Sequence, residues 1–199
     1  MSILEYLEKH LSKFKAQSIL DYIYESKCTL KITKPRKTKR GDFRQFGTQL
    51  SISVNHDTNS YRFLFTLIHE IAHLKTYLEY KNKVKPHGPE WKANFKELFT
   101  YFKMQEEFGK DENILAVTTA ELENPKACSG VSLEVERAFA KFDATPVIYL
   151  EDIPDGGKFS FRNHSYKKLE TRRSRVLCLN IANNRKYTIN KAASVSPCQ

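Results

Sequence analysis

The sequence predicts an α+β chain with two parts: a mainly helical part with a small β-sheet over residues 1–145, and a small antiparallel β module over residues 146–199. In the first part, most apolar residues recur at intervals of three and four, which indicates helices. After Thr145, short alternating or β-rich segments are separated by turn sequences such as PDGG and ANN. With 199 residues, the chain has room for a main domain with a small appendage and for a substantial core.

The N-terminal segment is expected to begin with helix and to continue with strands. Residues 2–26 have apolar side chains at helical spacing, which predicts one or two helices. Residues 28–33 (CTLKIT) alternate and are β-branched, and residues 50–55 (LSISVN) alternate with their apolar residues on one face, so both are predicted strands. We expect the segment between them, KPRKTKRGDFR at 34–44, to be a hairpin or loop with Gly41 at its turn.

Helical spacing dominates the middle of the chain. The polar residues 55–60 (NHDTNS) should supply the N-cap of a long helix over residues 62–80. Further helices are predicted over residues 89–108 and 132–143, whereas residues 111–124 indicate a loop with a helical turn. Strands of the β module are predicted at VIYL (147–150), KFSF (158–161), SRVLCLNI (174–181) and KYTI (186–189).

The centre of the long helix contains the motif HEIAH, which begins at His69 and ends at His73. Side chains four apart lie one turn above the other on the same helix face, so the two histidines can present two imidazole nitrogens to one metal ion. Glu70 projects about 100° around the helix from His69, so its carboxylate can act as a general base beside the metal without binding it. The spacing therefore favours a metal site with a base next to it.

The surroundings of the motif argue against two ordinary hydrogen-bonded surface histidines. The helix over residues 62–80 is apolar nearly all round, which predicts that it is buried. Two imidazoles and a carboxylate buried without partners would cost roughly several kcal/mol, and a divalent cation provides a partner for all of them. We therefore expect Zn²⁺ as the cofactor.

A catalytic zinc site needs a third protein ligand and an open position. The metzincin pattern has a histidine six residues after the second one, where this chain has Glu79, so that arrangement is excluded. His87 opens the sequence HGPEW, whose Gly-Pro pair indicates a turn that leads into a helix. Glu90 and Glu97 in that helix are alternatives, because Glu97 follows His73 by 24 residues, a separation typical of gluzincins.

These motifs together resemble the SprT-like family of zinc metallopeptidases. The family has an HExxH helix that is followed, after a short basic loop, by a sequence like HGPEW at the head of a second helix. The segments LSISVN and KTKRGDFR are also similar to the family's lead-in, so the resemblance covers roughly residues 15–110. It implies that residues 1–145 form a zincin-like helical metalloprotease domain with a small β-sheet.

The resemblance also implies an activity and a set of site residues. It implies a zinc metalloendopeptidase in which His69, His73 and His87 bind the metal and Glu70 is the catalytic base. Glu90 and Glu97 then become ordinary helix residues. Eukaryotic members of the family degrade proteins attached to DNA and are activated by DNA, so the resemblance implies a protein substrate and DNA–protein crosslink repair.

Composition suggests the location of the protein and excludes a second metal module. No apolar run reaches the roughly 18 residues of a membrane span, and the N-terminus has no signal-peptide core. We expect a cytoplasmic monomer with no membrane partner. The four cysteines form no CxxC pair, so we expect reduced thiols and exclude the zinc ribbon that many SprT-like proteins have after the protease domain.

The net charge of +10 includes two basic runs, at residues 27–44 and 158–175, that are interleaved with aromatic residues. Cationic side chains neutralise phosphates and aromatic rings stack on unpaired bases, so the runs predict DNA binding, to a single-stranded or flexible form, and association with the nucleoid. The alternative is a solvated charged face on strands whose aromatic residues point into a core. The candidate DNA contacts are Lys34, Arg36, Lys37, Lys39, Arg40, Lys167, Lys168, Arg172, Arg173 and Arg175.

Three classes of function remain open. The first is a DNA-associated zinc protease, and the second is a zinc peptidase with no nucleic-acid role. The third is a non-proteolytic nucleic-acid-binding or transcription-associated factor with a structural zinc site. The presence of Glu70 argues against the third class, because a structural site has no use for a base beside an open metal position.

Overall fold

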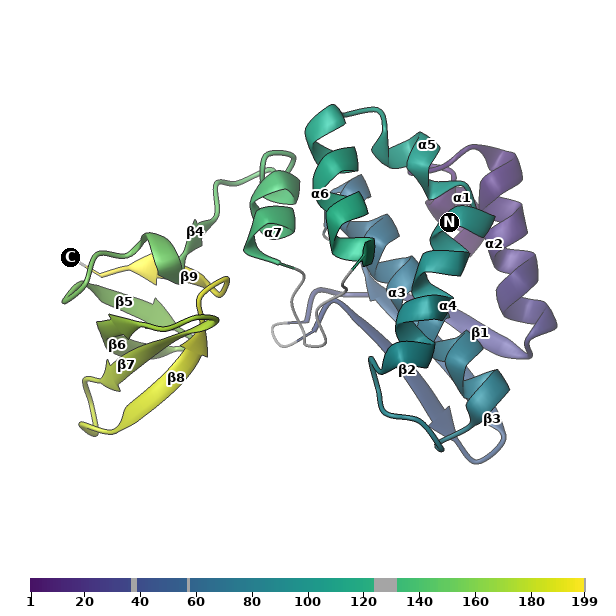
Figure 1. Cartoon of the computed structure of the whole chain (residues 1–199). Helices are drawn as coiled ribbons and strands as arrows, with labels where there is room; N and C mark the ends of the chain where they lie inside the picture. Colours follow the sequence, from purple (N-terminus) through teal and green to yellow (C-terminus); the bar gives the residue numbers. More distant parts are fainter. Residues whose placement is uncertain (37–38, 57, 124–131, 199) are drawn as a thin grey trace. The chain divides into compact units, whose positions relative to one another are not determined.

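The computed structural model describes residues 1–36, 39–56, 58–123 and 132–198. The chain divides into two units, Met1–Val131 and Ser132–Gln199, and each unit contains helix and sheet, as an α+β chain should (Figure 1). No helix among the described residues is long and apolar enough to cross a membrane.

The first unit contains helices that pack against a three-stranded sheet. Its elements are α1 (Ile3–Leu7), α2 (Lys13–Glu25), β1 (Cys28–Thr33), β2 (Gly41–Phe46), β3 (Gln49–Asn55), α3 (Ser60–Tyr80), α4 (Pro89–Tyr101), α5 (Met104–Phe108) and α6 (Glu112–Glu123). Residues 2–26 therefore form two helices, and the predicted strand over 28–33 is confirmed.

The sheet has the order β1-β3-β2, with β3 parallel to β1 and antiparallel to β2. Ile52 and Val54 on β3 are buried, which confirms the predicted apolar face of that strand. Gly41, however, was expected at a turn, whereas it is the first residue of β2. The prediction missed this edge strand because the segment is dominated by charged residues, which are poor strand formers.

The long helix α3 packs against β2, β3 and α4 (Figure 1). Its N-cap is Asn59, whose side chain accepts a hydrogen bond from the Arg62 N–H, as the polar sequence before the helix predicted. Phe63, Leu67 and Ile71 have no exposed surface, so one face of α3 forms the centre of the core. The histidine motif therefore lies on a helix that contributes to the core of the unit.

Two helix predictions for the first unit were wrong. The helix expected over residues 89–108 is divided between α4 and α5 by Lys103, which is left-handed (φ 51°) and whose carbonyl accepts a hydrogen bond from the Lys15 Nζ. The segment expected to be mostly loop contains α6, which is capped by the Asp111 carboxylate at the Ile114 N–H. A tertiary contact accompanies the break at Lys103, and a side-chain cap marks the start of α6. Neither feature appears in the local hydrophobic pattern.

In its described residues, 132–198, the second unit contains one α-helix and a six-stranded sheet of order β4-β9-β5-β6-β7-β8. Its elements are α7 (Leu133–Ala140), β4 (Ile148–Tyr149), the 3₁₀ helix η1 (Leu150–Asp152), β5 (Lys158–Phe161), β6 (His164–Thr171), β7 (Arg175–Asn180), β8 (Lys186–Asn190) and β9 (Ser194–Pro197). The predicted strands correspond to β4, β5, β7 and β8, whereas β6 and β9 were missed. Arg162 and Asn163 both have positive φ and form the two-residue turn between β5 and β6.

The helix α7 belongs by its contacts to the second unit, although the sequence places the domain boundary after residue 145. The Tyr149 hydroxyl donates a buried hydrogen bond to the Glu136 carbonyl, and the Arg137 guanidinium lies 3.3 Å from the Glu151 carboxylate. These bonds join α7 to the start of the sheet. Cys28, Cys178 and Cys198 are free thiols, as expected, whereas Cys128 lies outside the described residues.

Candidate metal centre

Three imidazoles converge on one point at the junction of α3 and α4. The Nε2 atom of His73 lies 3.2 Å from that of His69 and 3.0 Å from that of His87. The His87 and His69 Nε2 atoms are 3.1 Å apart, which completes the triangle. In the part of the chain that the structure describes, these residues form the one group of histidine, cysteine and acidic side chains able to hold a metal ion.

The triangle fits a tetrahedral metal ion. Three ring nitrogens at mutual distances near 3 Å cannot all satisfy one another by hydrogen bonds, because each neutral ring has one donor and one acceptor nitrogen. A zinc–nitrogen distance of about 2.0–2.1 Å places three ligand nitrogens about 3.3 Å apart in a tetrahedron. The observed spacing is close to this value, and the donor set leaves one position open.

The protonation of the three rings also suits metal binding. Burial, together with the neighbouring charge of His87, lowers the pKa of His73 from 6.5 to about 4. Burial and the charges of His73 and His87 lower the pKa of His69 well below its usual value, and burial lowers the pKa of His87. All three rings are therefore neutral at pH 7 and keep the lone pairs that a metal requires.

The third imidazole comes from a turn of unusual backbone geometry. His87 has a left-handed conformation with φ 58°, which is uncommon for a residue with a side chain. A Cβ atom at Gly88 would lie 2.9 Å from the Lys85 carbonyl oxygen, so the tight turn requires glycine there. Pro89 then occupies the first turn of α4, where its fixed φ favours the helix. Each of the first three letters of HGPEW thus has its own physical role.

The tryptophan of HGPEW closes one side of the centre. Trp91 has only 1 % of its surface exposed, and its ring centroid lies 4.6 Å from those of His69 and His87. Phe95 stacks on the indole at 5.1 Å with an interplanar angle of 15°, and its ring centroid lies 5.9 Å from that of His69. This aromatic packing excludes water from one side of the imidazoles and limits the rotations of their rings.

Glu70 is held beside the centre by the backbone of β2. Its residue exposure is 7 %, and the Phe43 N–H donates a hydrogen bond to the carboxylate. Burial raises the pKa of Glu70 to about 8, although this hydrogen bond and the charges of Arg36 and Lys39 act in the opposite direction. The sequence could not have shown this contact, because the donor is a main-chain group on a strand far from Glu70 in the chain.

The alternative ligands Glu90 and Glu97 lie apart from the three imidazoles, and so does Glu79, which occupies the position of the metzincin histidine. Glu97 has a side chain that is 63 % exposed and lies 3.4 Å from the Lys75 Nζ. Glu79 accepts a hydrogen bond from the Asn94 amide at 2.8 Å and thereby ties α3 to α4. Neither of these residues nor Glu90 belongs to the metal-binding group. The structure therefore brings together the three histidines and leaves the glutamates apart.

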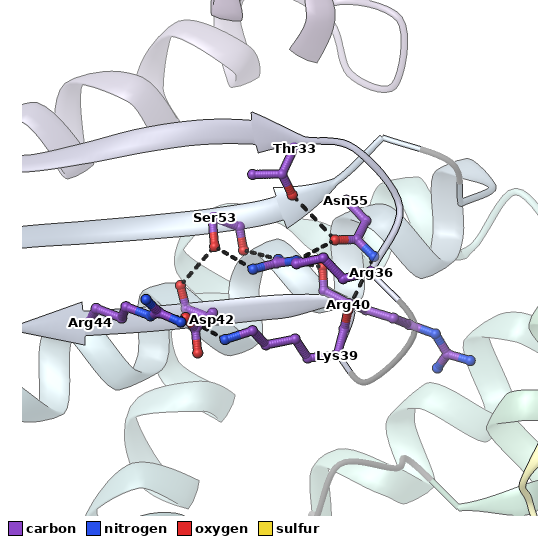
Figure 2. A network of polar contacts seen from close by, with 8 residues as sticks. All are labelled: Thr33, Arg36, Lys39, Arg40, Asp42, Arg44, Ser53 and Asn55. Atoms are coloured by element: carbon purple, nitrogen blue, oxygen red, sulfur yellow. Dashed lines mark hydrogen bonds and ion pairs between the residues drawn. The ribbon is translucent and has the colours of Figure 1, made fainter. Parts of the chain in front are cut away.

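The candidate DNA contacts of the first basic run differ in their availability. Arg36 donates its hydrogen bonds to oxygens within the protein, and Lys39 lies 2.8 Å from the carboxylate of Asp42 (Figure 2). Lys34 and Arg40 are exposed, whereas Lys37 lies outside the described residues. The bonds of Arg36 indicate a structural role for this residue.

The second basic run includes a lysine that cannot reach a DNA ligand. Lys168 is 4 % exposed, and its Nζ donates to the carbonyl oxygens of Glu151 at 3.0 Å and Ile153 at 2.7 Å. Its prediction as a DNA contact was wrong, because Lys168 follows the buried Tyr166 by two residues on β6 and lies opposite the buried Cys178, on the core face of the sheet. The other four candidates are exposed: Lys167, Arg172, Arg173 and Arg175.

The aromatic residues of the second run are not available for stacking on bases. Phe159 and Tyr166 are buried in the core of the second unit, and Phe161 packs against that core. The aromatic residues of this run therefore point into a core, as the alternative interpretation expects, and they do not support base stacking. The exposed face of these strands instead contains Lys158 and Lys186, which were not among the candidate contacts.

Replacing any one of the three histidines by alanine should weaken zinc binding by more than about 100-fold, because even groups that only orient a ligand contribute about 10- to 100-fold. Competition with a chromogenic chelator measures the affinity. The matched variants Glu90→Gln and Glu97→Gln should bind zinc as the unaltered protein does. If Glu97→Gln loses zinc and His87→Ala retains it, the assignment of the third ligand is wrong.

Lowering the pH from 7 to 5 should destabilise the metal-free protein through His73. The pKa of this residue is about 4 in the folded chain and 6.5 ordinarily, so the unfolded chain binds more protons between these values. The stabilisation is fully present above pH 6.5 and is lost as the pH falls toward 4. Urea unfolding in the presence of a chelator measures the effect. His73→Gln should show a weaker pH dependence, and identical slopes for the two proteins would contradict the assignment.

Comparison with protein families agrees with the geometry of the centre. The model of the SprT-like family matches residues 8–108, which are 101 of the 199 residues. This segment begins in the N-terminal helical region and ends at the last residue of α5, so it includes all three histidines and Glu70. No curated protein and no solved structure matches the chain. Since the family match extends over more than half of its length, the chain belongs to the SprT-like family.

Proposed function

We propose that the protein is a zinc-dependent endopeptidase of SprT-like type with a zincin-like first unit. The observation that supports this best is the convergence of three neutral imidazoles beside Glu70, a buried carboxylate that lies outside the ligand triangle. A metal site with a purely structural role gains nothing from such a carboxylate, whereas hydrolysis requires a base at this place. Membership of the SprT-like family supports the same conclusion.

The residues of the centre have separate roles in the proposed reaction. His69, His73 and His87 would hold Zn²⁺, which supplies Lewis acidity and an activated water when bound. Glu70 accepts a proton from the attacking water and delivers it to the amine that leaves. The Phe43 N–H orients the Glu70 carboxylate, and Trp91 keeps one side of the site dry. The low exposure of Glu70 makes its carboxylate a stronger proton acceptor than one in water.

For the substrate, we propose proteins associated with DNA, with DNA bound by the second unit. Charge supports this part of the proposal. Between residues 156 and 199 the sequence has one acidic residue, Glu170, and ten basic residues. These are Lys158, Arg162, Lys167, Lys168, Arg172, Arg173, Arg175, Arg185, Lys186 and Lys191.

Three of these lysines form a row across the sheet, which we call the lysine row. Lys158 on β5 is directly opposite Lys167 on β6, and Leu179 on β7 lies between Lys167 and Lys186 on β8. Directly opposite residues share one face of a sheet, and all three lysines are exposed. Like charges directly opposite each other destabilise a sheet, and a phosphate backbone would relieve this repulsion.

Replacing Glu70 by glutamine should reduce peptide hydrolysis by about 100- to 10,000-fold without loss of zinc, because the amide cannot accept the proton. Cleavage of a basic DNA-binding protein, and of the protein itself, is followed by gel electrophoresis with and without single-stranded DNA, and zinc is measured in the same samples. A zinc-loaded chain that cleaves neither substrate would favour the nucleic-acid-binding factor with a structural zinc site.

Replacing Lys158, Lys167 and Lys186 together by glutamine should weaken binding of a single-stranded oligonucleotide and reduce the slope of log affinity against log salt by about 2. Fluorescence anisotropy at several salt concentrations measures both quantities. The control replaces Arg137 and Lys191, which are paired with Glu151 in the same unit. Unchanged binding by the triple variant would exclude the lysine row as the DNA site.

A further inference from the structure

Arg36 joins three segments of the first unit at the end of its sheet. Its Nε donates to the Asn55 Oδ1 at 2.8 Å, and its Nη1 donates to the Ser53 Oγ at 3.0 Å. Its Nη2 lies 3.3 Å from the Ser53 carbonyl oxygen and 3.4 Å from that of Arg40. All of these acceptors are neutral oxygens. The guanidinium thus acts as a bridge between the chain after β1, the end of β3 and the residue before β2 (Figure 2).

Asn55 reinforces this bridge from the end of β3. Its exposure is 2 %, and its backbone N–H donates to the Arg40 carbonyl oxygen at 2.8 Å. Its side-chain amide donates to the Lys39 carbonyl oxygen at 3.1 Å, while its Oδ1 accepts from Arg36. Figure 2 shows that the Arg40 side chain points away from this network, so it is the Arg40 backbone that the network holds. The start of β2 is therefore tied to β3 at consecutive residues.

The strand β2, which begins at Gly41 directly after these hydrogen bonds, packs against Glu70. A Cβ atom at Gly41 would lie 2.5 Å from the Glu70 Oε1 and 2.6 Å from the Thr66 Cγ2, so β2 approaches α3 as closely as a backbone can. Two residues further on, the Phe43 N–H donates to the Glu70 carboxylate. A shift of β2 away from α3 would remove this donor, and a shift toward α3 would cause a collision at Gly41.

The pairing of β2 explains why Phe43 is free to make this contact. The Arg40 carbonyl oxygen accepts a hydrogen bond from the Asn55 N–H. Since hydrogen-bonded pairs alternate along an antiparallel ladder, the N–H and C=O groups of the even-numbered residues of β2 point to β3. The N–H groups of Gly41, Phe43 and Gln45 therefore point to the open edge of the sheet, and the Phe43 N–H meets Glu70 there. The register of β2 against β3 thus decides which amide reaches the carboxylate.

We infer that Arg36 is a positioning residue for Glu70, acting through Asn55 and the start of β2. This inference rests on the proposed peptidase function for its catalytic consequence, but the geometry that it describes is present without any reaction. It also gives Arg36 a role other than the DNA contact expected from the basic run. Lysine cannot replace arginine in this role, because an ammonium group cannot span several acceptors in a fixed plane.

Amide hydrogen exchange of the metal-free protein, followed by NMR, tests the geometry directly. In the unaltered protein, the Phe43 amide should exchange slowly, whereas the Gln45 amide on the same open edge should exchange fast. Glu70→Ala should remove the protection of Phe43, and Arg36→Lys should reduce it at least about 10-fold. Arg44→Lys, on the same strand, is the matched control and should leave it unchanged. Slow exchange of Leu67 and Ile71 in α3 would show that each variant is folded.

The kinetic consequence is tested on the zinc-loaded protein. Arg36→Lys should lower kcat by about 10- to 100-fold with little change in KM or zinc content, because misplacing a catalytic group by about 1 Å has costs of this size. Gly41→Ala should show the same pattern without any change at Arg36, and it serves as the second variant if Arg36→Lys does not fold.

Two results would overturn the inference. The first is unaltered protection of the Phe43 amide in Arg36→Lys, and the second is a loss of activity that is matched by a loss of zinc. If the unaltered protein cleaves no substrate, the peptidase proposal fails, and amide exchange alone decides whether Arg36 holds β2 against Glu70. Failure of the inference and failure of the proposed function are therefore distinguishable.

Discussion

Burial of ionisable groups is the constraint on which the metal centre depends. The apolar interior around α3 disfavours charge, so it keeps the three histidines neutral and raises the pKa of Glu70. Neutral imidazoles are what a cation needs, whereas a protonated carboxylate is not yet a base. A cation bound by the histidines would lower the pKa of the nearby carboxyl group again, since opposite charge favours ionisation. The same environment therefore prepares both kinds of group for one divalent ion.

The three histidines of the candidate metal centre were predictable from sequence because the placement of each depends on local geometry. The spacing of His69 and His73 follows from the helical repeat, and the position of His87 follows from a Gly-Pro turn. The contact between the β2 backbone and Glu70 was not predictable, since β2 is distant in the sequence and has no apolar alternation. A hydrogen bond from a main-chain N–H leaves no trace in residue identity, apart from the absent side chain of Gly41.

The second unit shows where pattern alone is insufficient. Alternation separates the two faces of β5 and β6, but it does not say which face is covered. Hydrophobic aromatic residues occupy the core face, and alternation along β6 places Lys168 on that face two residues after Tyr166, where its ammonium group donates to two carbonyl oxygens. In the first unit, the pattern also failed to predict the helix α6.

The β-branched Thr118 in this helix is a weak helix former. The structure accommodates it by a buried hydrogen bond from its hydroxyl to the Ile114 carbonyl oxygen.

The left-handed backbone of His87 connects metal occupancy to the order of a loop. Two ligands are displayed by α3 alone, while the third depends on the connection between α3 and α4, most of whose residues are exposed. An ion that holds His87 selects the one conformation of this connection in which the turn is closed, and its binding energy offsets the strain of that conformation. Binding of the ion and closure of the connection would therefore be linked equilibria. A change that destabilises the closed turn would lower the affinity for the ion, and removal of the ion would destabilise the closed turn by the same free energy.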